Sequence, residues 1–465
     1  MTRSFKKKEI ILMMTALLLG SFITTLAETL LNNGLPMIME ETHVTQMSAQ
    51  WLSTGYMLVA GMLMPLAAFF MHRFSLKNLF MSTMSIFLLG TIIVAIAPNF
   101  NLLLVGRLIQ AIAVGINMPL VTNVLTIVIP AENRGLAIGV SGIIINLGPA
   151  IGPTLSGIIL EHYTWRMLFI ILIPFTILAI IFTQLWVKSV IKPEKVSVDV
   201  LSALLIIFGL GALLYSLGRF GVKDSNLIST LIVAIIGIAL ITIFVKRQLK
   251  IKNPLLNLQV FSYSEYRLGA IITLLVSGAT MAPELVLPLF NQEILKASPI
   301  VSGTVMIPSA LAMAILSPLS GKLYDEYGIK RVSVIGGLMG LIAAIPMFFY
   351  DANTAIVWLT VLYAIRCAGL TLCYTPASVY ALNALPQDSV VSGNTIIVTL
   401  VQVANSFCTA FAVATQNIVK SNALKHSSST VAAISGYQWA FGTTILITLI
   451  ACVLIFKIKD DKATK

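Results

Sequence analysis

Apolar stretches of about 20 residues recur along the whole chain, and short polar segments separate them. As a helix, a stretch of that length spans the hydrocarbon core of a bilayer, about 30 Å thick. Helices are required because lipid offers no hydrogen-bond partner to backbone N–H and C=O groups. Strands of a membrane barrel would be shorter and would alternate in hydrophobicity. The pattern therefore predicts an all-α polytopic membrane protein.

Fourteen spans follow from this pattern. The first contains polar Glu28 and is too long for the apolar region of a signal peptide, so we interpret it as a retained span. The fourteen predicted spans are 10–32, 48–70, 79–97, 101–128, 135–160, 166–187, 197–217, 226–245, 267–290, 299–321, 332–350, 354–381, 390–418 and 436–456.

Composition and charge support a membrane environment. Hydrophobic residues make up 58% of the chain and charged residues only 10%, whereas soluble domains carry about 25% charged residues. The net charge of +12 does not indicate a nucleic-acid partner, because 22 of the 30 basic residues fall in segments that lie on the inner side if the N-terminus is cytoplasmic. Only six fall in the outer segments. This bias predicts that both termini are cytoplasmic.

An internal repeat divides the chain. Residues 65–78 (PLAAFFMHRFSLKN) align with 318–331 (PLSGKLYDEYGIKR), and each segment ends the second span of its half and enters a basic loop. We predict an N-terminal six-helix bundle at 1–188, two inserted helices with a linker at 189–259, and a C-terminal six-helix bundle at 260–465. Duplicated transporters of this kind place the substrate at the interface of their halves, near the midplane.

Four ionisable side chains lie well inside the predicted spans: Glu28, Arg107, Glu284 and Arg366. Each costs at least about 2.5 kcal/mol at the bilayer centre unless it faces a cavity or a partner. We predict that they serve proton coupling or cation recognition, with Pro283 breaking the ninth span and exposing Glu284. Because a guanidinium keeps its proton, the arginines would tune the acids. The alternatives are arginines satisfied by backbone carbonyls and acids that only reach water.

Two motifs resemble those of the major facilitator superfamily. Residues 321–331 (GKLYDEYGIKR) are similar to its loop motif, and residues 142–157 (GIIINLGPAIGPTLSG) to the antiporter signature of its fourteen-span drug:proton antiporter family. Two departures stand out: Ala27 occupies a usual aspartate position, and Ala68, His72 and Ser75 replace glycine, aspartate and glycine in the first-half loop. The resemblance implies the major facilitator fold, two six-helix bundles plus two inserted helices.

The resemblance also implies site residues. The antiporter motif comprises Gly142, Gly148, Pro149, Gly152, Pro153 and Gly157. The gating loop comprises Arg73, Gly321, Asp325, Gly328, Lys330 and Arg331. Candidates for a substrate pocket are Asn32, Tyr56, Gln110, Asn146, Met281 and Tyr374.

These features predict a monomeric, proton-coupled antiporter of the bacterial plasma membrane that exports hydrophobic, cationic compounds by alternating access. Its partners would be protons, small-molecule substrates and the lipid bilayer. No cofactor or metal is expected, since the proton motive force drives transport and no GxxxxGK[ST] loop occurs. A dedicated exporter of one metabolite, antibiotic or lipid is the main alternative. An intramembrane enzyme is disfavoured because all four histidines fall in or near loops, without metal-ligand spacing.

Overall fold

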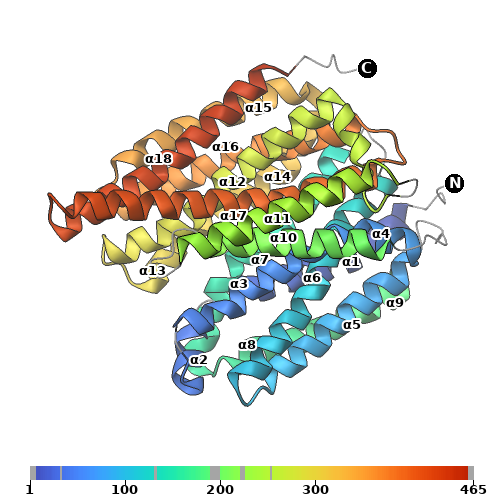
Figure 1. Ribbon diagram of the computed structural model, residues 1–465, viewed down its shortest axis with the longest axis horizontal. Helices are drawn as coiled ribbons and strands as arrows, with labels where there is room; N and C mark the ends of the chain where they lie inside the picture. The colour runs from blue at the N-terminus through green and yellow to red at the C-terminus, as the bar shows by residue number, and fades with distance from the viewer. Residues whose placement is uncertain are drawn as a thin grey trace.

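The computed structural model describes residues 7–31, 34–44, 46–129, 134–188, 199–219, 226–251 and 254–458, although some side chains at 36, 46–50, 134–154 and 299–300 are not described. Every regular element in these ranges is a helix (Figure 1). The elements are α1 (Lys7–Leu30), α2 (Leu35–Thr42), α3 (Gln46–Leu63), α4 (Leu66–Arg73), α5 (Leu76–Ala95), α6 (Phe100–Val128), α7 (Arg134–His162), α8 (Arg166–Ile170), α9 (Leu172–Trp186), α10 (Val200–Arg219), α11 (Leu227–Gln248), η3 (Leu258–Ser262), α12 (Ser264–Glu293), α13 (Pro299–Thr304), α14 (Ile307–Tyr327), α15 (Ile329–Ala344), η4 (Ile345–Phe349), α16 (Ile356–Asn383), α17 (Val390–Ala423) and α18 (Ser429–Phe456).

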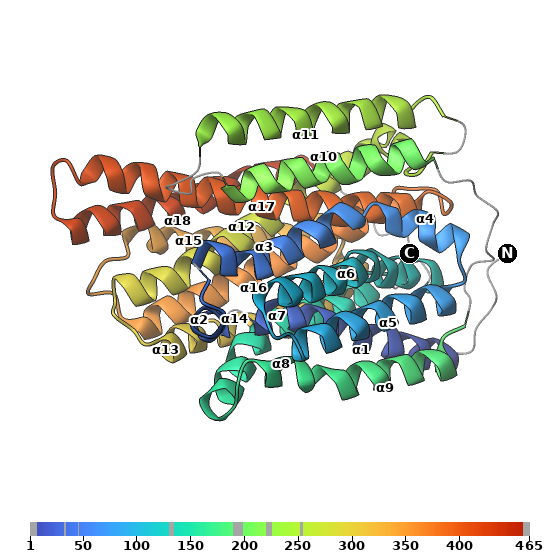
Figure 2. The ribbon, with the colours of Figure 1, turned by 60° about the horizontal axis from the view of Figure 1, so that its bottom comes forward.

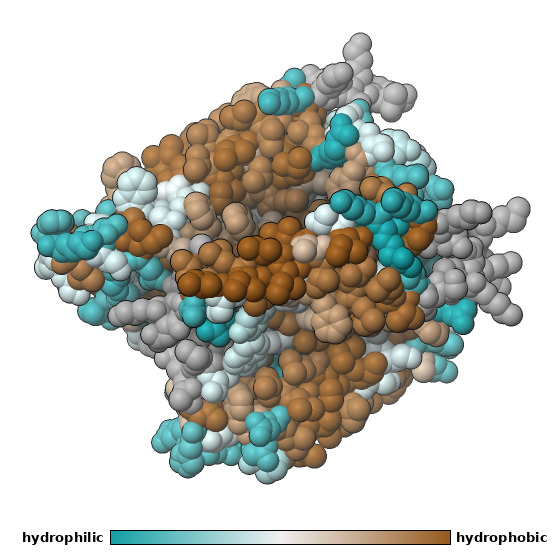
Figure 3. Space-filling view, viewed as in Figure 1, coloured by the Kyte–Doolittle hydropathy of each residue, from teal (hydrophilic) through white to brown (hydrophobic). Residues whose placement is uncertain are grey.

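The long helices run side by side, and both chain termini lie at the same end of the bundle (Figures 1 and 2). We call this the terminal end. The opposite end, where α2 and α13 lie, is the distal end. Apolar side chains cover the middle of the face seen in Figure 3, and hydrophilic ones gather toward the two ends. This distribution is that of a protein whose long axis crosses a membrane.

The helices match the predicted spans to within a few residues at most ends. Twelve helices in the described part of the chain are long and apolar enough to cross a membrane, or thirteen if the bent pair α3 and α4 is one span. Helix α7, whose side chains are only partly described, is 29 residues long and is not among them. The count of fourteen spans stays a prediction.

Three of the differences from the prediction have a clear physical cause. The second span bends by 55° where Pro65 begins α4, because proline removes a backbone hydrogen bond. Helix α12 is continuous through Pro283, so the expected break beside Glu284 is wrong. Neighbouring helices stabilise a membrane helix that contains proline. Helix α14 continues to Tyr327, six residues past the predicted span, since charged residues are tolerated once a helix leaves the apolar layer.

The buried apolar residues form three clusters. The largest joins α1–α10 with residues at the terminal ends of α12, α16 and α17. The other two lie among α12–α18. We refer to α1–α9 as the N-terminal helices and to α12–α18 as the C-terminal helices. The boundaries of the two predicted bundles, at residues 188 and 260, stay a prediction.

Helices α10 and α11 form a hairpin that lies over α3 and α17 (Figure 2). Gly211 of α10 allows close contact with Met62 of α3, whose Cε is 2.7 Å from the position a Cβ at Gly211 would take. Trp51 of α3 also stacks on Tyr215 of α10, with ring centroids 5.8 Å apart. Helix α11 has its apolar face exposed, as expected of a lipid-facing helix.

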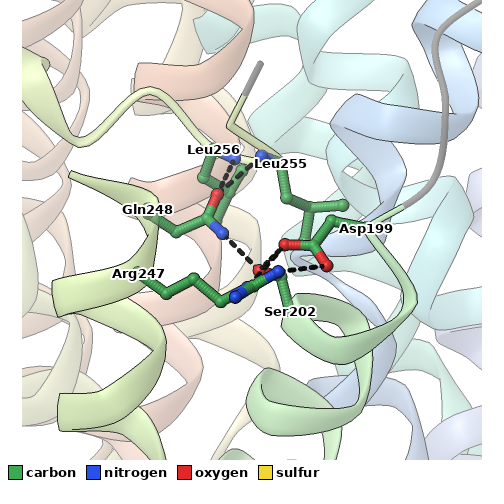
Figure 4. A network of polar contacts seen from close by, with 6 residues as sticks. All are labelled: Asp199, Ser202, Arg247, Gln248, Leu255 and Leu256. Carbon is green, nitrogen blue, oxygen red and sulfur yellow. Dashed lines mark hydrogen bonds and ion pairs between the residues drawn. The ribbon is translucent and has the colours of Figure 1, made fainter. Parts of the chain in front are cut away.

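A polar network closes the base of this hairpin (Figure 4). Arg247 donates two hydrogen bonds to Asp199, of 2.7 and 3.0 Å, and Ser202 donates a third of 2.6 Å. The bonds from Arg247 and Ser202 lower the pKa of Asp199 to about 2. Buried Gln248 donates to Ser202 and accepts from the backbone N–H groups of Leu255 and Leu256. The network therefore ties both helices of the hairpin to the segment that leads to α12.

A second polar cluster ties α2 to α8 at the distal end. Trp165 Nε1 donates to one oxygen of Glu41 at 2.7 Å, and Arg166 forms an ion pair with the other oxygen, also at 2.7 Å. Partial burial raises the pKa of Glu41, but the hydrogen bonds from Trp165 and Arg166 outweigh it and hold that pKa below its usual value. Trp165 and Arg166 thus hold α2 in place beside α8.

Candidate transport site

Arg107 of α6 is fully buried among the N-terminal helices. Its Nε donates to the carbonyl of Leu52 at 3.2 Å, and its Nη1 donates to the carbonyl of Ala27 at 3.1 Å and to Gln110 Oε1 at 3.0 Å. The Tyr56 ring lies 4.1 Å from the guanidinium carbon. Arg107 is thus fixed by α1 and α3, directly beside the backbone of Glu28.

Glu28 of α1 is half-buried and lies within electrostatic range of Arg107. Its helix packs closely against α7, because Gly148 and Gly152 of the antiporter motif face Thr25 and Thr29 on either side of Glu28. A side chain at either glycine would collide with the facing threonine hydroxyl. The small residues of the motif therefore allow α7 to approach the part of α1 that carries the acid.

Arg366 of α16 repeats this arrangement among the C-terminal helices. It is fully buried, and its Nη2 donates to the carbonyl of Ala279 in α12 at 2.6 Å. Its Nε and Nη1 have no hydrogen-bond partner among the described residues. Tyr350 and Tyr363 interact with it electrostatically. Each arginine thus binds a carbonyl of the helix that supplies the predicted acid, α1 for Arg107 and α12 for Arg366.

Glu284 of α12 is half-buried, and the groups within its electrostatic range come from both groups of helices. It interacts with Tyr363 and Cys367 on α16, and the charge of Glu28 acts on it from α1. Two acids that are 256 residues apart in the sequence therefore lie within electrostatic range of each other. Close carboxyl groups resist simultaneous ionisation, which favours binding of a proton or a cation between them.

The terminal end is closed by contacts between α7 and α14. Gly135 and Gly139 of α7 lie against the backbone of α14, at Gly321 and at Ser317 respectively, so closely that a side chain at either glycine would collide with it. Asp325 also faces Gly135, at 2.6 Å from the position of a Cβ there. Part of the predicted gating loop, Gly321 and Asp325, thus lies within helix α14 rather than in a loop.

The remaining residues of the predicted gating loop surround the helix junctions. Gly328 alone connects α14 to α15, with a φ of 77° that favours glycine. Lys330 and Arg331 lie in the first turn of α15, and Arg73 is the last residue of α4.

Three hydrogen bonds between α6 and α17 complete the closure. Asn123 Nδ2 donates to Thr395 at 2.9 Å, and Asn394 Nδ2 donates to Asn123 Oδ1 at 2.7 Å and to Thr122 at 2.8 Å. We call these four residues the polar clasp. Sequence reasoning missed the clasp, although asparagines inside apolar spans were a visible signal.

The predicted pocket residues are dispersed. Gln110 and Tyr56 are fully buried, and both contact Arg107. Gln110 also donates a hydrogen bond to Thr91 at 2.8 Å, and Tyr56 donates one to the Thr24 carbonyl at 3.2 Å. Met281 and Tyr374 are half-buried on the C-terminal helices.

Several predicted residues are only partly described. Gly142 and Gly157 are half-buried in α7. Asn32 and the side chains of Asn146, Pro149 and Pro153 lie outside the described residues. In the described part of the chain, no three His, Cys, Asp or Glu side chains gather as metal ligands would.

Comparison with known proteins gives a consistent result. The family model of the Major Facilitator Superfamily matches residues 17–409. The uncharacterised MFS-type transporter YcnB of Bacillus subtilis is 36% identical over 96% of this chain and 94% of its own. The lincomycin resistance protein LmrB of Bacillus subtilis is 33% identical over 97% and 96%.

More distant proteins share the architecture. The riboflavin transporter RibZ of Clostridioides difficile is 26% identical over 98% of this chain and 99% of its own. The crystal structure of the human organic anion transporter MFSD10 superposes with a TM-score of 0.69 at 14% identity, covering 97% of this chain and all of that one. On the family match and the fold together, this chain is a membrane transporter that belongs to the Major Facilitator Superfamily.

Proposed function

We propose that the protein is a proton-coupled antiporter that exports hydrophobic, cationic compounds across a bacterial plasma membrane by alternating access. The observation that supports it best is that Glu28 and Glu284, on helices from the two groups, lie within electrostatic range of each other. A proton and a cationic substrate would compete for these carboxyl groups, and competition for one site couples their opposite movements. The name of the relative LmrB supports an export role.

In this proposal the terminal end faces the cytoplasm, in keeping with the excess of basic residues in the segments at that end. Helix α7 would supply the fourteenth span. The polar clasp and the contacts of α7 with α14 then close the cytoplasmic side, and rocking of the helix groups would open it. The buried arginines keep their charge and tune the acids beside them.

The test is substrate-induced proton release from energised inside-out vesicles, with wild type, Glu28→Gln and Glu284→Gln. We expect the wild type to release protons when a cationic compound is added and Glu284→Gln to release none. Glu326→Gln, which removes an exposed acid at the terminal end, is the matched control and should behave as wild type. Normal proton release by both Glu28→Gln and Glu284→Gln would disprove the role of these acids.

Dedicated export of one compound is the second candidate, and the riboflavin transporter RibZ favours it. A panel of neutral and cationic compounds in the same assay separates the two. A response to many unrelated cations supports multidrug export, whereas a response to a single compound supports the dedicated carrier.

A further inference from the structure

Helices α12 and α17 lie in close contact beside the Glu284 site. A side chain at Gly278 of α12 would collide with Cys408 of α17, so the backbones approach closely there. At this level Ser277 Oγ donates a hydrogen bond of 2.8 Å to Asn405 Oδ1. The bond fixes the amide plane of Asn405 and turns its NH₂ group away from Ser277.

Asn405 lies on the face of α17 that is turned toward the N-terminal helices. It follows Asn394 of the polar clasp by 11 residues, about three turns, so both side chains lie on the same face. The lipid-facing side of α17 is marked by the exposed residues Phe407, Phe411 and Ile418, and Asn405 points about 160° away from Phe407. Asn405 is thus about 16 Å beyond the clasp, toward the distal end.

The partner helix presents Glu284 on the same side. Ser277, Met281 and Glu284 of α12 are spaced by four and three residues, so they line one helix face. Along that face Ser277 and Glu284 are about 10 Å apart. Because Ser277 binds Asn405, the level of Asn405 and that of Glu284 are about two helical turns apart along α12.

The amide groups here have unused hydrogen-bonding capacity. A carboxamide makes up to four hydrogen bonds, but the side chain of Asn405 makes only the bond from Ser277 within the described residues. Gln402, one turn away and next to Gly61 of α3, makes none with its side chain among those residues. At membrane depth an unpaired amide is costly, so such groups face a cavity or a ligand.

We propose that Asn405, together with Gln402, binds hydroxyl or amide groups of the substrate while Glu284 takes its cationic group. The inference rests on the proposed function and narrows the substrate class. It predicts that the substrates of this protein are amines that carry several hydroxyl or amide groups. Asn405 would be the residue that distinguishes these amines from purely lipophilic cations.

The test compares two probes in proteoliposomes: lincomycin, an amine with hydroxyl groups and an amide, and tetraphenylphosphonium, a cation without hydrogen-bonding groups. We expect Asn405→Leu to weaken lincomycin binding and lincomycin-driven proton release by about 10-fold, because a site built to bind polar groups loses affinity when one partner is removed. Tetraphenylphosphonium should change by less than about 2-fold, since it makes no such bond.

Ser277→Ala is the control for a purely structural role, because it removes the hydrogen bond that joins α12 to α17 at this level and leaves the Asn405 amide in place. If Asn405 only fastens the helices, both variants will weaken both probes equally, and the proposal fails. It also fails if Asn405→Leu leaves lincomycin binding unchanged or if the wild type binds only tetraphenylphosphonium. Equilibrium binding measures substrate recognition even if no proton is transported. A failure of the substrate-recognition proposal can therefore be distinguished from a failure of proton coupling.

Discussion

Arg107 and Arg366 retain buried charges because backbone carbonyls of the neighbouring helix, at Ala27 and Ala279, accept their hydrogen bonds. The alternative of arginines satisfied by carbonyls describes these contacts only in part, because Arg107 Nη2 and Arg366 Nε and Nη1 have no hydrogen-bond partner among the described residues. For Arg107 an aromatic ring adds to these contacts, since Tyr56 covers its guanidinium at 4.1 Å. We infer that Tyr56 positions Arg107 rather than binding substrate.

Tyr56→Leu should lower transport by about 30-fold, because a desolvated cation–π contact is worth about 2 kcal/mol. Tyr56→Phe keeps the ring and should stay within about 3-fold of wild type, losing only the bond to the Thr24 carbonyl. Initial rates of substrate uptake into inside-out vesicles measure both. Equal losses in the two variants would show that the hydroxyl, and not the ring, is what matters.

At the scale of elements, close contacts between helices depend on glycines and on a few buried amides. Gly148 and Gly152 allow α7 to contact α1, and Gly135 and Gly139 allow it to contact α14. The hairpin α10–α11 is held at its base by Gln248, which is 3% exposed, while the Arg247–Asp199 ion pair is more exposed. The buried hydrogen bonds of Gln248 should therefore contribute more to the stability of the protein than the ion pair does.

Gln248→Leu should destabilise the detergent-solubilised protein by about 2 kcal/mol, because the N–H groups of Leu255 and Leu256 lose their acceptor while buried. Arg247→Ala should cost less than Gln248→Leu, as the loss of a partly exposed ion pair does. Thermal unfolding at pH 7 tests both. Asp199 is ionised there in folded and unfolded protein, and its contribution is lost only as the pH falls from about 3.8 toward 2. A larger loss for Arg247→Ala would contradict the ranking.

At the scale of the whole molecule, the terminal end is closed by two sets of contacts that must separate together if the helix groups rock. The polar clasp joins α6 to α17, and the glycines of α7 lie against α14. Both sets join N-terminal to C-terminal helices. Weakening either should therefore shift the population toward a state that is open at this end.

Asn394→Ala and Gly139→Leu should lengthen the distance between spin labels at Asn78 and Glu326, two exposed positions at the terminal end. The first variant removes two hydrogen bonds, and the second places a side chain where α14 lies. Gly303→Ala is the control, because no atom lies within 4 Å of its Cβ position. Unchanged distance distributions in both variants would refute the clasp as a closing element.

Sequence alone determined the elements of this protein. Runs of about 20 apolar residues form helices in any membrane fold because the lipid leaves the backbone no other partner, so their positions follow from local pattern. The four charged residues within these runs could be identified from the sequence as well, because they interrupt an apolar pattern. The bend at Pro65 and the unbroken helix at Pro283 were not predictable, because neighbouring helices decide whether a proline bends its helix.

Only the tertiary structure decided which residues meet. The approach of Glu28 to within electrostatic range of Glu284, the clasp of Asn123 with Asn394, and the pairing of Ser277 with Asn405 each involve helices that are far apart in the chain. Membrane helices associate through small residues and polar contacts that are specific to each pair, and no periodicity along one helix encodes its neighbour. The sequence therefore specified the helices and their candidate charges, whereas packing between helices specified the site.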